Sequence, residues 1–130
     1  MKILIVEDEA FVALSLKFLL SCQGHEVTDI ADDLSTAIDA VDRETPDLAL
    51  VDFQLTDGSS GLEVARELCE RSILCIFVTG NAPEQPFKHL GIGCLPKPYS
   101  DAALAGSLCI AEALLAKTEP PPPPQGFQLY

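Results

Sequence analysis

The fold is decided by the stretch Asp47-Leu48-Ala49-Leu50-Val51-Asp52. Its four apolar residues have the length of a strand, and an apolar run without alternation is typical of a parallel strand covered on both faces. The stretch ends in Asp52, which places a carboxylate at the carboxyl end of the strand. In an open parallel sheet these ends line one crevice, where ligands bind. Asp52 is therefore the first candidate for a functional residue.

Other apolar runs along the chain also end in polar residues. These are Glu7 and Asp8 after residues 2–6, Thr79 at the end of 73–79, and Lys97 after 92–96. The carboxyl ends of parallel strands share one edge, so we expect these side chains to lie near Asp52. Carboxylates at close range repel one another, and Mg²⁺, which prefers oxygen ligands, relieves that repulsion. The acids therefore predict a Mg²⁺ site; alternatively, residues 7–9 form an acidic loop at the positive end of the next helix.

Predicted strands alternate with predicted helices along the chain. The strands are expected at about 2–7, 26–31, 48–52, 73–79 and 92–96, and the helices at about 10–22, 34–44, 61–71 and 100–116, the last with Ser100 as its N-cap. Alternating strands and helices predict an α/β fold, a doubly wound parallel sheet with helices on both faces. We infer five strands in the order 2-1-3-4-5, which makes the first and third strands neighbours.

The ordered set of site residues, together with this alternation, resembles the receiver domain of bacterial two-component response regulators. The set is Glu7-Asp8, then Asp52, then Thr79, then Lys97-Pro98. The resemblance covers residues 1–117 and implies a flavodoxin-like fold. It implies that Asp8 and Asp52 bind Mg²⁺ directly, with the backbone carbonyl of Gln54 as a further ligand and Glu7 acting through water. It also implies that Thr79 and Lys97 contact the phosphoryl group and that the Lys97-Pro98 bond is cis.

The resemblance further implies a phosphoacceptor function. Asp52 would accept a phosphoryl group from a histidine kinase or a histidine phosphotransfer protein, and the change would alter contacts with an unknown output protein. Such a protein is not a conventional enzyme, because it promotes only its own Mg²⁺-dependent phosphorylation and dephosphorylation. The helix at 10–22 is apolar around most of its circumference, so it is either enclosed or a contact surface. In receivers this helix meets the helical bundle that carries the phosphohistidine.

Three alternatives belong to other classes. A Mg²⁺-dependent phosphohydrolase with an aspartate nucleophile would carry Asp-x-Asp after the first strand, whereas residues 7–9 are Glu-Asp-Glu. An adaptor that works without phosphorylation would not need Asp8, Asp52, Thr79 and Lys97 together. A flavodoxin would carry a Ser/Thr-rich phosphate loop after the first strand, and none is present.

Two features depart from the usual receiver pattern. The segment Phe77-Val78-Thr79-Gly80 resembles a subgroup with a Phe-x-Thr-Gly motif and a shortened helix four, and residues 81–91 contain two prolines. We therefore expect helix four to be short or absent. Most receivers carry an aromatic residue three positions before the lysine, where this chain has Cys94. Signalling through an inward-turning ring at that position is therefore not expected.

Composition sets the remaining limits. The chain has 130 residues, 48% of them hydrophobic, which fits one domain with one core. A net charge of −12 argues against binding to nucleic acid or anionic membranes. Five cysteines without a Cys-x-x-Cys pair predict free thiols in a reducing cytosol, and we expect those at 22, 69, 75 and 109 to be buried because they fall in apolar segments. With no signal peptide and no apolar stretch long enough for a membrane span, we expect a cytoplasmic protein.

Residues 118–130 differ from the rest of the chain. They contain an uninterrupted proline run at 120–124, which predicts an extended polyproline segment. We expect 118–130 to be a proline-rich disordered tail. The alternatives are a linear docking motif or the beginning of a linker.

Overall fold

The computed structural model describes residues 1–53, 55, 61–80 and 89–130. Its elements are β1 (Lys2–Val6), α1 (Ala10–Cys22), β2 (Glu26–Ala31), α2 (Leu34–Arg43), β3 (Leu48–Val51), α3 (Gly61–Glu70), β4 (Leu74–Thr79), β5 (Gly93–Pro96), α4 (Asp101–Leu115) and β6 (Gln128–Leu129). The expected ligand Gln54 lies outside the described residues. So do residues 81–88, which hold most of the short helix expected between β4 and β5.

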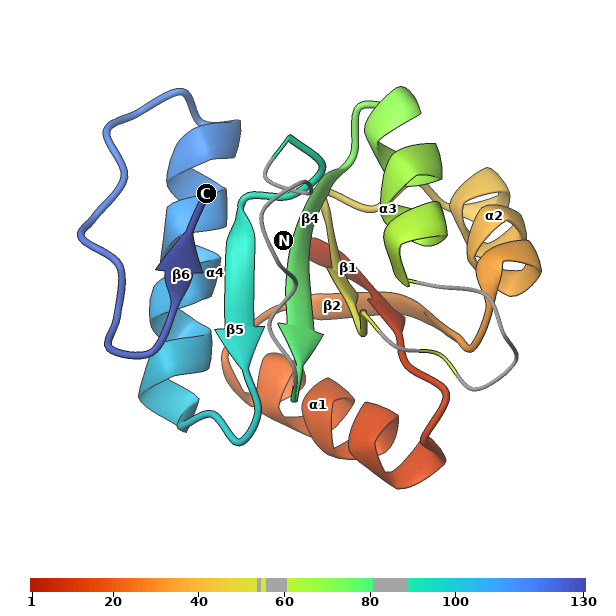
Figure 1. The fold of residues 1–130 in the computed structure, drawn as a ribbon, viewed down its shortest axis with the longest axis horizontal. Coiled ribbons are helices and arrows are strands. Elements are labelled where there is room, and N and C mark those ends of the chain that lie inside the picture. Colours follow the sequence, from red (N-terminus) through yellow and green to blue (C-terminus); the bar gives the residue numbers. More distant parts are fainter. Residues whose placement is uncertain (54, 56–60, 81–88) are drawn as a thin grey trace.

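The sheet has the order β2-β1-β3-β4-β5-β6 (Figure 1). Strands β1 to β5 pair in parallel, which confirms the predicted order 2-1-3-4-5. Because β1 pairs with both β2 and β3, the topological switch point lies at the carboxyl end of β1. This order brings the polar residues that follow β1 and β3 to one edge of the sheet.

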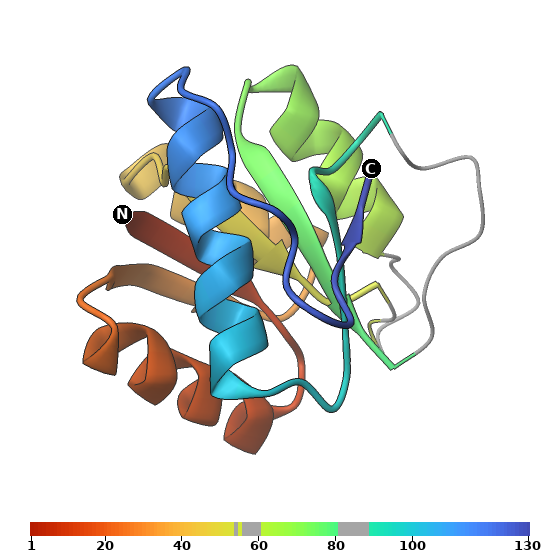
Figure 2. The ribbon, with the colours of Figure 1, turned by 90° about the vertical axis from the view of Figure 1, so that its left-hand side faces the viewer.

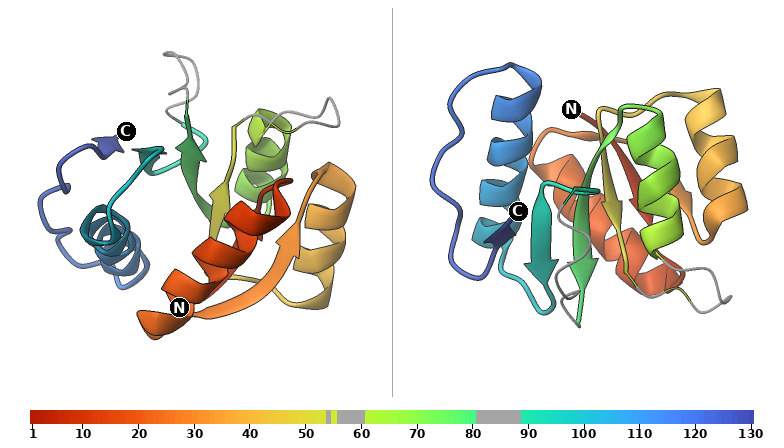
Figure 3. Two further views of the ribbon diagram at one scale, coloured as in Figure 1. Left: turned by 90° about the horizontal axis from the view of Figure 1, so that it is seen from below. Right: turned by 45° about the horizontal axis from the view of Figure 1, so that its top comes forward.

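Helices cover both faces of the sheet, as the alternation predicts (Figures 2 and 3). Along β1, Ile3 and Ile5 pack with α1 and α4, whereas Leu4 and Val6 pack with α2 and α3. Successive residues of a strand point to opposite faces, so an uninterrupted apolar run supplies both cores. All four of these β1 side chains are fully buried.

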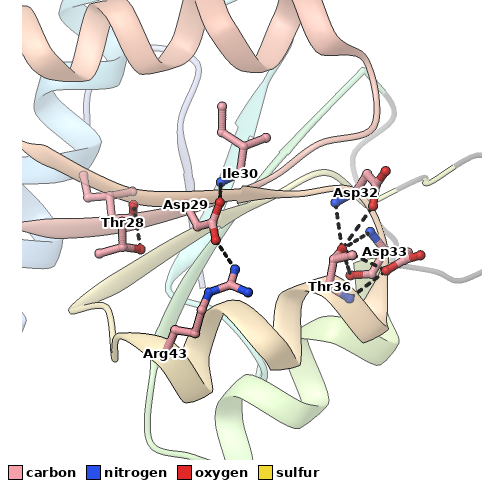
Figure 4. Close-up of polar contacts among 8 residues, drawn as sticks. Thr28, Asp29, Ile30, Asp32, Asp33, Thr36 and Arg43 are labelled. Carbon is pink, nitrogen blue, oxygen red and sulfur yellow. Dashed lines mark hydrogen bonds and ion pairs between the residues drawn. The ribbon is translucent and has the colours of Figure 1, made fainter.

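Side-chain caps fix where two helices begin. The carboxylate of Asp33 accepts a hydrogen bond from the backbone N–H of Thr36 at 2.8 Å, and the Thr36 hydroxyl accepts one from the N–H of Asp33 at 3.2 Å (Figure 4). This capping box satisfies donors that the first turn of α2 leaves unpaired. Arg43, in the last turn of the same helix, pairs with Asp29 of β2. Ser100 caps α4 as predicted, accepting from the N–H of Ala103 at 3.0 Å.

The carboxyl-terminal segment differs from the predicted disordered tail. It ends in β6, which pairs antiparallel with β5 and adds a sixth strand to the sheet. Phe127 is buried in the core on the α1–α4 side, and Tyr130 packs against the core on the other side. Burial of the Phe127 side chain, and of part of Tyr130, favours the docked position of this segment.

No helix in the described part of the chain is long and apolar enough to cross a membrane.

Candidate functional site

Three carboxylates meet at the switch point. Glu7, Asp8 and Asp52 each offer an oxygen, and these oxygens lie within 4.8 Å of one another. Backbone pairing holds the acids there. The N–H of Asp52 donates to the carbonyl oxygen of Val6 at 2.9 Å, and the N–H of Glu7 donates to that of Ala31 at 2.9 Å. The structure thus brings together the two acidic stretches that the sequence places at neighbouring strand ends.

Glu7 is the most deeply placed of the three acids, with 5% of its surface exposed. Burial raises the pKa of this carboxyl above its ordinary value, and its hydrogen bond to Lys97 opposes the rise only in part. The carboxylate also accepts a hydrogen bond from the N–H of Glu9 at 3.1 Å. Glu7 is therefore held in a fixed position at the floor of the crevice, beside the more accessible Asp8 and Asp52.

Lys97 brings a positive charge into the acidic cluster. Its Nζ lies 2.9 Å from Glu7 Oε2 and 3.4 Å from Asp52 Oδ2. Burial lowers the pKa of this amine, but the hydrogen bond to Glu7 and the charge of Asp52 outweigh burial, so the pKa is raised. The amine is therefore charged at neutral pH and partly neutralises the acids.

The position of Lys97 follows from the pairing of β4 with β5. The N–H of Lys97 donates to the carbonyl oxygen of Thr79 at 2.9 Å, which extends the ladder beyond the end of β5. The Lys97-Pro98 peptide bond is cis, as the resemblance implies. Thr79 is the last residue of β4 and is 2% exposed. Because β4 lies between β3 and β5, Thr79 belongs to the same edge of the sheet as Asp52 and Lys97.

Gly61 is a site residue that the sequence reasoning did not single out. It begins α3, and its N–H donates to the carbonyl oxygen of Phe53 at 2.8 Å. A Cβ at this position would overlap the carbonyl oxygen of Asp52 and approach Phe53 Cα to 2.7 Å. Only glycine lets α3 approach the backbone of Asp52 this closely. The glycine at the start of a predicted helix, after a polar loop, was the available signal.

Comparison with known proteins decides the family. The family model of the response regulator receiver domain matches residues 3–108. The chain belongs to this family. As a receiver domain, it carries an acidic cluster of the kind through which receivers bind Mg²⁺. Family membership supports a phosphoacceptor role in two-component signalling, and it favours this role over the phosphohydrolase and flavodoxin alternatives.

Two curated relatives of this receiver are longer proteins. The phyllosphere-induced regulator PhyR of Methylorubrum extorquens is 35% identical over 123 residues, covering 87% of this chain and 43% of PhyR. The sensory transduction protein RegX3 of Mycobacterium tuberculosis is 34% identical over 103 residues, covering 75% of this chain and 44% of RegX3. The chain thus spans less than half the length of these curated relatives.

Solved receiver structures share the fold. The signal receiver domain of a modulated diguanylate cyclase from Desulfovibrio desulfuricans superposes with a TM-score of 0.77 at 29% identity, covering 88% of this chain and 97% of that one. The receiver domain of PhyR from Erythrobacter litoralis gives a TM-score of 0.73 at 27% identity, covering 93% of this chain and 94% of that one. The doubly wound α/β fold predicted from the strand–helix alternation, and the flavodoxin-like form that the resemblance implies, are thereby confirmed.

Proposed function

We propose that this receiver accepts a phosphoryl group from a phosphohistidine protein onto Asp52. The observation that carries the proposal is the position of Asp52, which shares the end of the crevice with two other acids and has the Lys97 amine 3.4 Å from its carboxylate. A carboxylate is a competent nucleophile toward phosphorus when nearby cations neutralise the charge that gathers there.

The proposed transfer exchanges one bond for another. An Asp52 carboxylate oxygen attacks phosphorus, a P–O bond forms, and the P–N bond to the donor histidine breaks. The leaving imidazole nitrogen keeps the electron pair of that bond and takes up a proton from solvent. Lys97 moves from the acids to a phosphoryl oxygen as a point charge, and the Thr79 hydroxyl donates to another oxygen.

Mg²⁺ fits the residues of the site. Glu7, Asp8 and Asp52 offer hard oxygen donors within 4.8 Å of one another, the ligand type that Mg²⁺ takes. Asp8 and Asp52 would hold the ion directly and Glu7 through water, with the Gln54 carbonyl as a further ligand. When bound, the ion supplies charge neutralisation at the phosphoryl oxygens. In this proposal the protein promotes only its own phosphorylation and dephosphorylation and has no other substrate.

The proposed docking surface for the phosphohistidine donor is the outer face of α1. Phe11, Leu14 and Phe18 are 87%, 55% and 68% exposed there. Residues at this spacing share one face of a helix, and the helix begins two residues after Asp8. Such a stripe of apolar side chains beside the crevice fits the apolar face of a partner helix. The acidic net charge disfavours nucleic acid as a direct partner.

A labelling experiment tests the proposal. Incubated with Mg²⁺ and acetyl phosphate, wild-type protein should gain one phosphoryl group by intact mass, and hydroxylamine should remove it. Chelation of Mg²⁺ and the Asp52→Asn substitution should each abolish the gain. Glu70→Gln, at an exposed acid on α3, is the matched control and should label like wild type. Undiminished labelling of Asp52→Asn would reject Asp52 as the acceptor.

A further inference from the structure

The last residues of the chain form a strap along the edge of the sheet. We define the strap as residues 127–130. In Figure 2 the chain runs back along α4 and returns beside β5. The strap pairs Gln128 with Cys94 and Leu129 with Gly93, and the N–H of Tyr130 donates to the carbonyl oxygen of Ile92 at 2.8 Å. Within the strap, Phe127 is buried, with 7% of its surface exposed.

Two glycines match the surface to this segment. A Cβ on Gly93 of β5 would overlap the Gln128 carbonyl oxygen and come within 2.5 Å of the Phe127 ring. A Cβ on Gly106 of α4 would lie 2.9 Å from Pro124 Cγ. Both distances are too short for real side chains, so the strap and the preceding proline run approach as closely as they do because these positions lack side chains. The edge of β5 is thus a shaped seat for this segment.

Aromatic rings connect the strap to the crevice. The Tyr130 and Phe77 ring centroids are 6.5 Å apart, and the Phe77 and Phe53 rings meet edge to face at 5.8 Å. Phe53 directly follows Asp52 in the chain. A row of three rings therefore runs from the neighbour of Asp52 to the end of the strap. Packed rings in this separation range attract one another beyond their area burial.

The seat of Tyr130 lies on the two strands that supply Thr79 and Lys97. Phe77 of β4 and Cys94 of β5 are register partners, and Tyr130 contacts both. Two residues beyond Phe77 the chain reaches Thr79, and three beyond Cys94 it reaches Lys97. If Thr79 and Lys97 move toward a phosphoryl group on Asp52, Phe77 and Cys94, on which the Tyr130 ring packs, should therefore move with them.

Tyr130 is docked at a cost. Its hydroxyl is buried and has no hydrogen-bond partner of normal geometry within the described residues. Burial and the neighbouring Cys94 thiol, a weak hydrogen-bonding group, raise the pKa of Tyr130 to about 12. A buried hydroxyl without a good partner gives back part of the free energy gained by burying the ring. We therefore expect the docked strap to open more readily than the rest of the sheet.

We propose that the edge of β5, with its Phe77–Cys94 seat, is a regulated binding surface whose occupant is the strap, and that modification of Asp52 releases it. The proposal rests on the proposed function of Asp52. A phosphoryl group adds up to about two negative charges. The Thr79 hydroxyl moves toward a phosphoryl oxygen, and the Lys97 amine leaves Glu7 for another. These movements shift the ends of β4 and β5 and spoil the fit of Tyr130. By linkage, release of the strap strengthens binding of a phosphoryl analogue at Asp52 by the same factor.

Cys94 reports whether the strap is docked. Its side chain is fully buried, as is that of Cys75. Cys22, Cys69 and Cys109 are exposed, so the burial expected for these three from their apolar segments is wrong. Tyr130 packs against Cys94, so release of the strap exposes this thiol. Burial raises the pKa of Cys75 to about 12, and this thiol is the reference for loss of packing elsewhere in the domain. Alkylation of Cys94 relative to Cys75, followed by peptide mass spectrometry, therefore separates strap release from global unfolding.

The experiment uses the whole chain with Mg²⁺ and beryllium trifluoride, an analogue that bonds to a carboxylate as a phosphoryl group does. Binding of the analogue is followed by its ¹⁹F signal, and alkylation of Cys94 by N-ethylmaleimide is followed over time. Loading Asp52 should speed Cys94 alkylation by about fivefold or more, the lower end of typical coupling between sites. Tyr130→Ala should raise affinity for the analogue by a similar factor. Leu129→Ala, at a half-exposed position on the same strap, is the matched control and should leave affinity unchanged.

Two results would overturn the inference in different ways. If the analogue binds wild type and Cys94 alkylation stays constant, the strap is not coupled to Asp52, and the proposed function stands. If the analogue does not bind wild type, both the coupling and the proposed function fail. Faster alkylation of Cys94 and Cys75 together would show unfolding of the domain, which also contradicts strap release.

Discussion

The amine of Lys97 lies 2.9 Å from the carboxylate of Glu7, which precedes it by 90 residues. The contact joins the end of β5 to the end of β1, across the two strands that lie between them. It sets the charge of the crevice, because the buried Glu7 carboxylate has this amine as a neutralising partner. If Lys97 moves to another group, the buried Glu7 carboxylate therefore needs another cation nearby to neutralise its charge.

Replacing Lys97 should destabilise the domain when Mg²⁺ is absent. In Lys97→Ala, Glu7 keeps its burial and loses its ion pair, which should lower the free energy of unfolding by about 1–3 kcal/mol, below the range for fully buried pairs because Lys97 is partly exposed. Millimolar Mg²⁺ should restore part of the loss, since a cation that binds only the native state stabilises it. Urea denaturation with and without Mg²⁺ measures both effects.

The control for Lys97 is an exposed lysine in a comparable pair. Lys2 lies 2.9 Å from Glu44, with about half of its side chain in solvent. Lys2→Ala should change stability little and should not alter the response to Mg²⁺, because exposed pairs contribute little. Equal losses for the two variants would show that Lys97 is an ordinary surface lysine.

His25 should make stability fall in mildly acidic solution. Its Nδ1 accepts a hydrogen bond from the amino-terminal amine at 3.0 Å, and its Nε2 lies 3.9 Å from Glu112 of α4. Burial, then the nearby amino-terminal charge, lowers the pKa of His25 against the opposing effect of Glu112. The folded state thus binds fewer protons than the unfolded state. Its contribution is present above the ordinary pKa of about 6.5 and is lost as pH falls below it.

Two histidine variants check this pH dependence. Chemical denaturation between about pH 5 and 7.5 should show a smaller slope of unfolding free energy with pH in His25→Gln than in wild type. His89→Gln, at an exposed position, is the control for the loss of a histidine side chain. An unchanged slope in His25→Gln would contradict the assigned burial effect.

The apolar stripe on α1 should affect the rate of phosphorylation by the donor protein and should not affect the rate of labelling by acetyl phosphate. Phe11→Ser with Phe18→Ser should slow phosphorylation by a cognate phosphohistidine protein by about tenfold or more, the equivalent of one lost interface anchor. Labelling by acetyl phosphate should be unchanged, because both side chains point to solvent. Lys17→Ala, also exposed on α1, is the control. If the variant is phosphorylated equally slowly by the phosphohistidine protein and by acetyl phosphate, the stripe supports the fold or the site and does not bind the donor protein.

Gly61→Ala tests the close approach of α3 to Asp52. The added methyl group meets backbone atoms of residues 52 and 53, which cannot rotate away as a side chain can. Overpacking of this kind costs about 1–3 kcal/mol. We expect lower stability in urea and slower labelling by acetyl phosphate. A variant with wild-type stability and labelling would show that α3 can shift freely.

The strand ends and the acidic cluster were predictable because both follow from a short-range pattern. An apolar run such as 48–51 shows a buried strand, and the topology rule then places Asp52 beside Glu7 and Asp8. The strap was not predictable in this way. Strand β6 has two residues, too few for periodicity to show, and it follows a proline run that is typical of disorder. Its docking depends on the shape of the seat around Gly93.

The sequence also did not predict which face of α1 is buried and which is exposed. Its apolar residues surround the helix, so hydrophobic periodicity does not select the buried side. The structure buries Ala13, Leu16 and Leu20, and it leaves Phe11 and Phe18 in solvent. The choice is made by packing against Ile3 and Ile5 of β1, which is a tertiary contact. Enclosure therefore holds for one face of this helix, and the exposed face is the one for which we propose a contact surface.

Locating the phosphoryl group within the chain shows whether Asp52 is the acceptor. Protein labelled with acetyl phosphate and Mg²⁺ is reduced with borohydride, which converts an aspartyl phosphate to homoserine, and is then mapped by peptide mass spectrometry. We expect homoserine at position 52 and unmodified aspartate at position 8. Homoserine at any other position, or a labelled protein with aspartate intact at position 52, would contradict it.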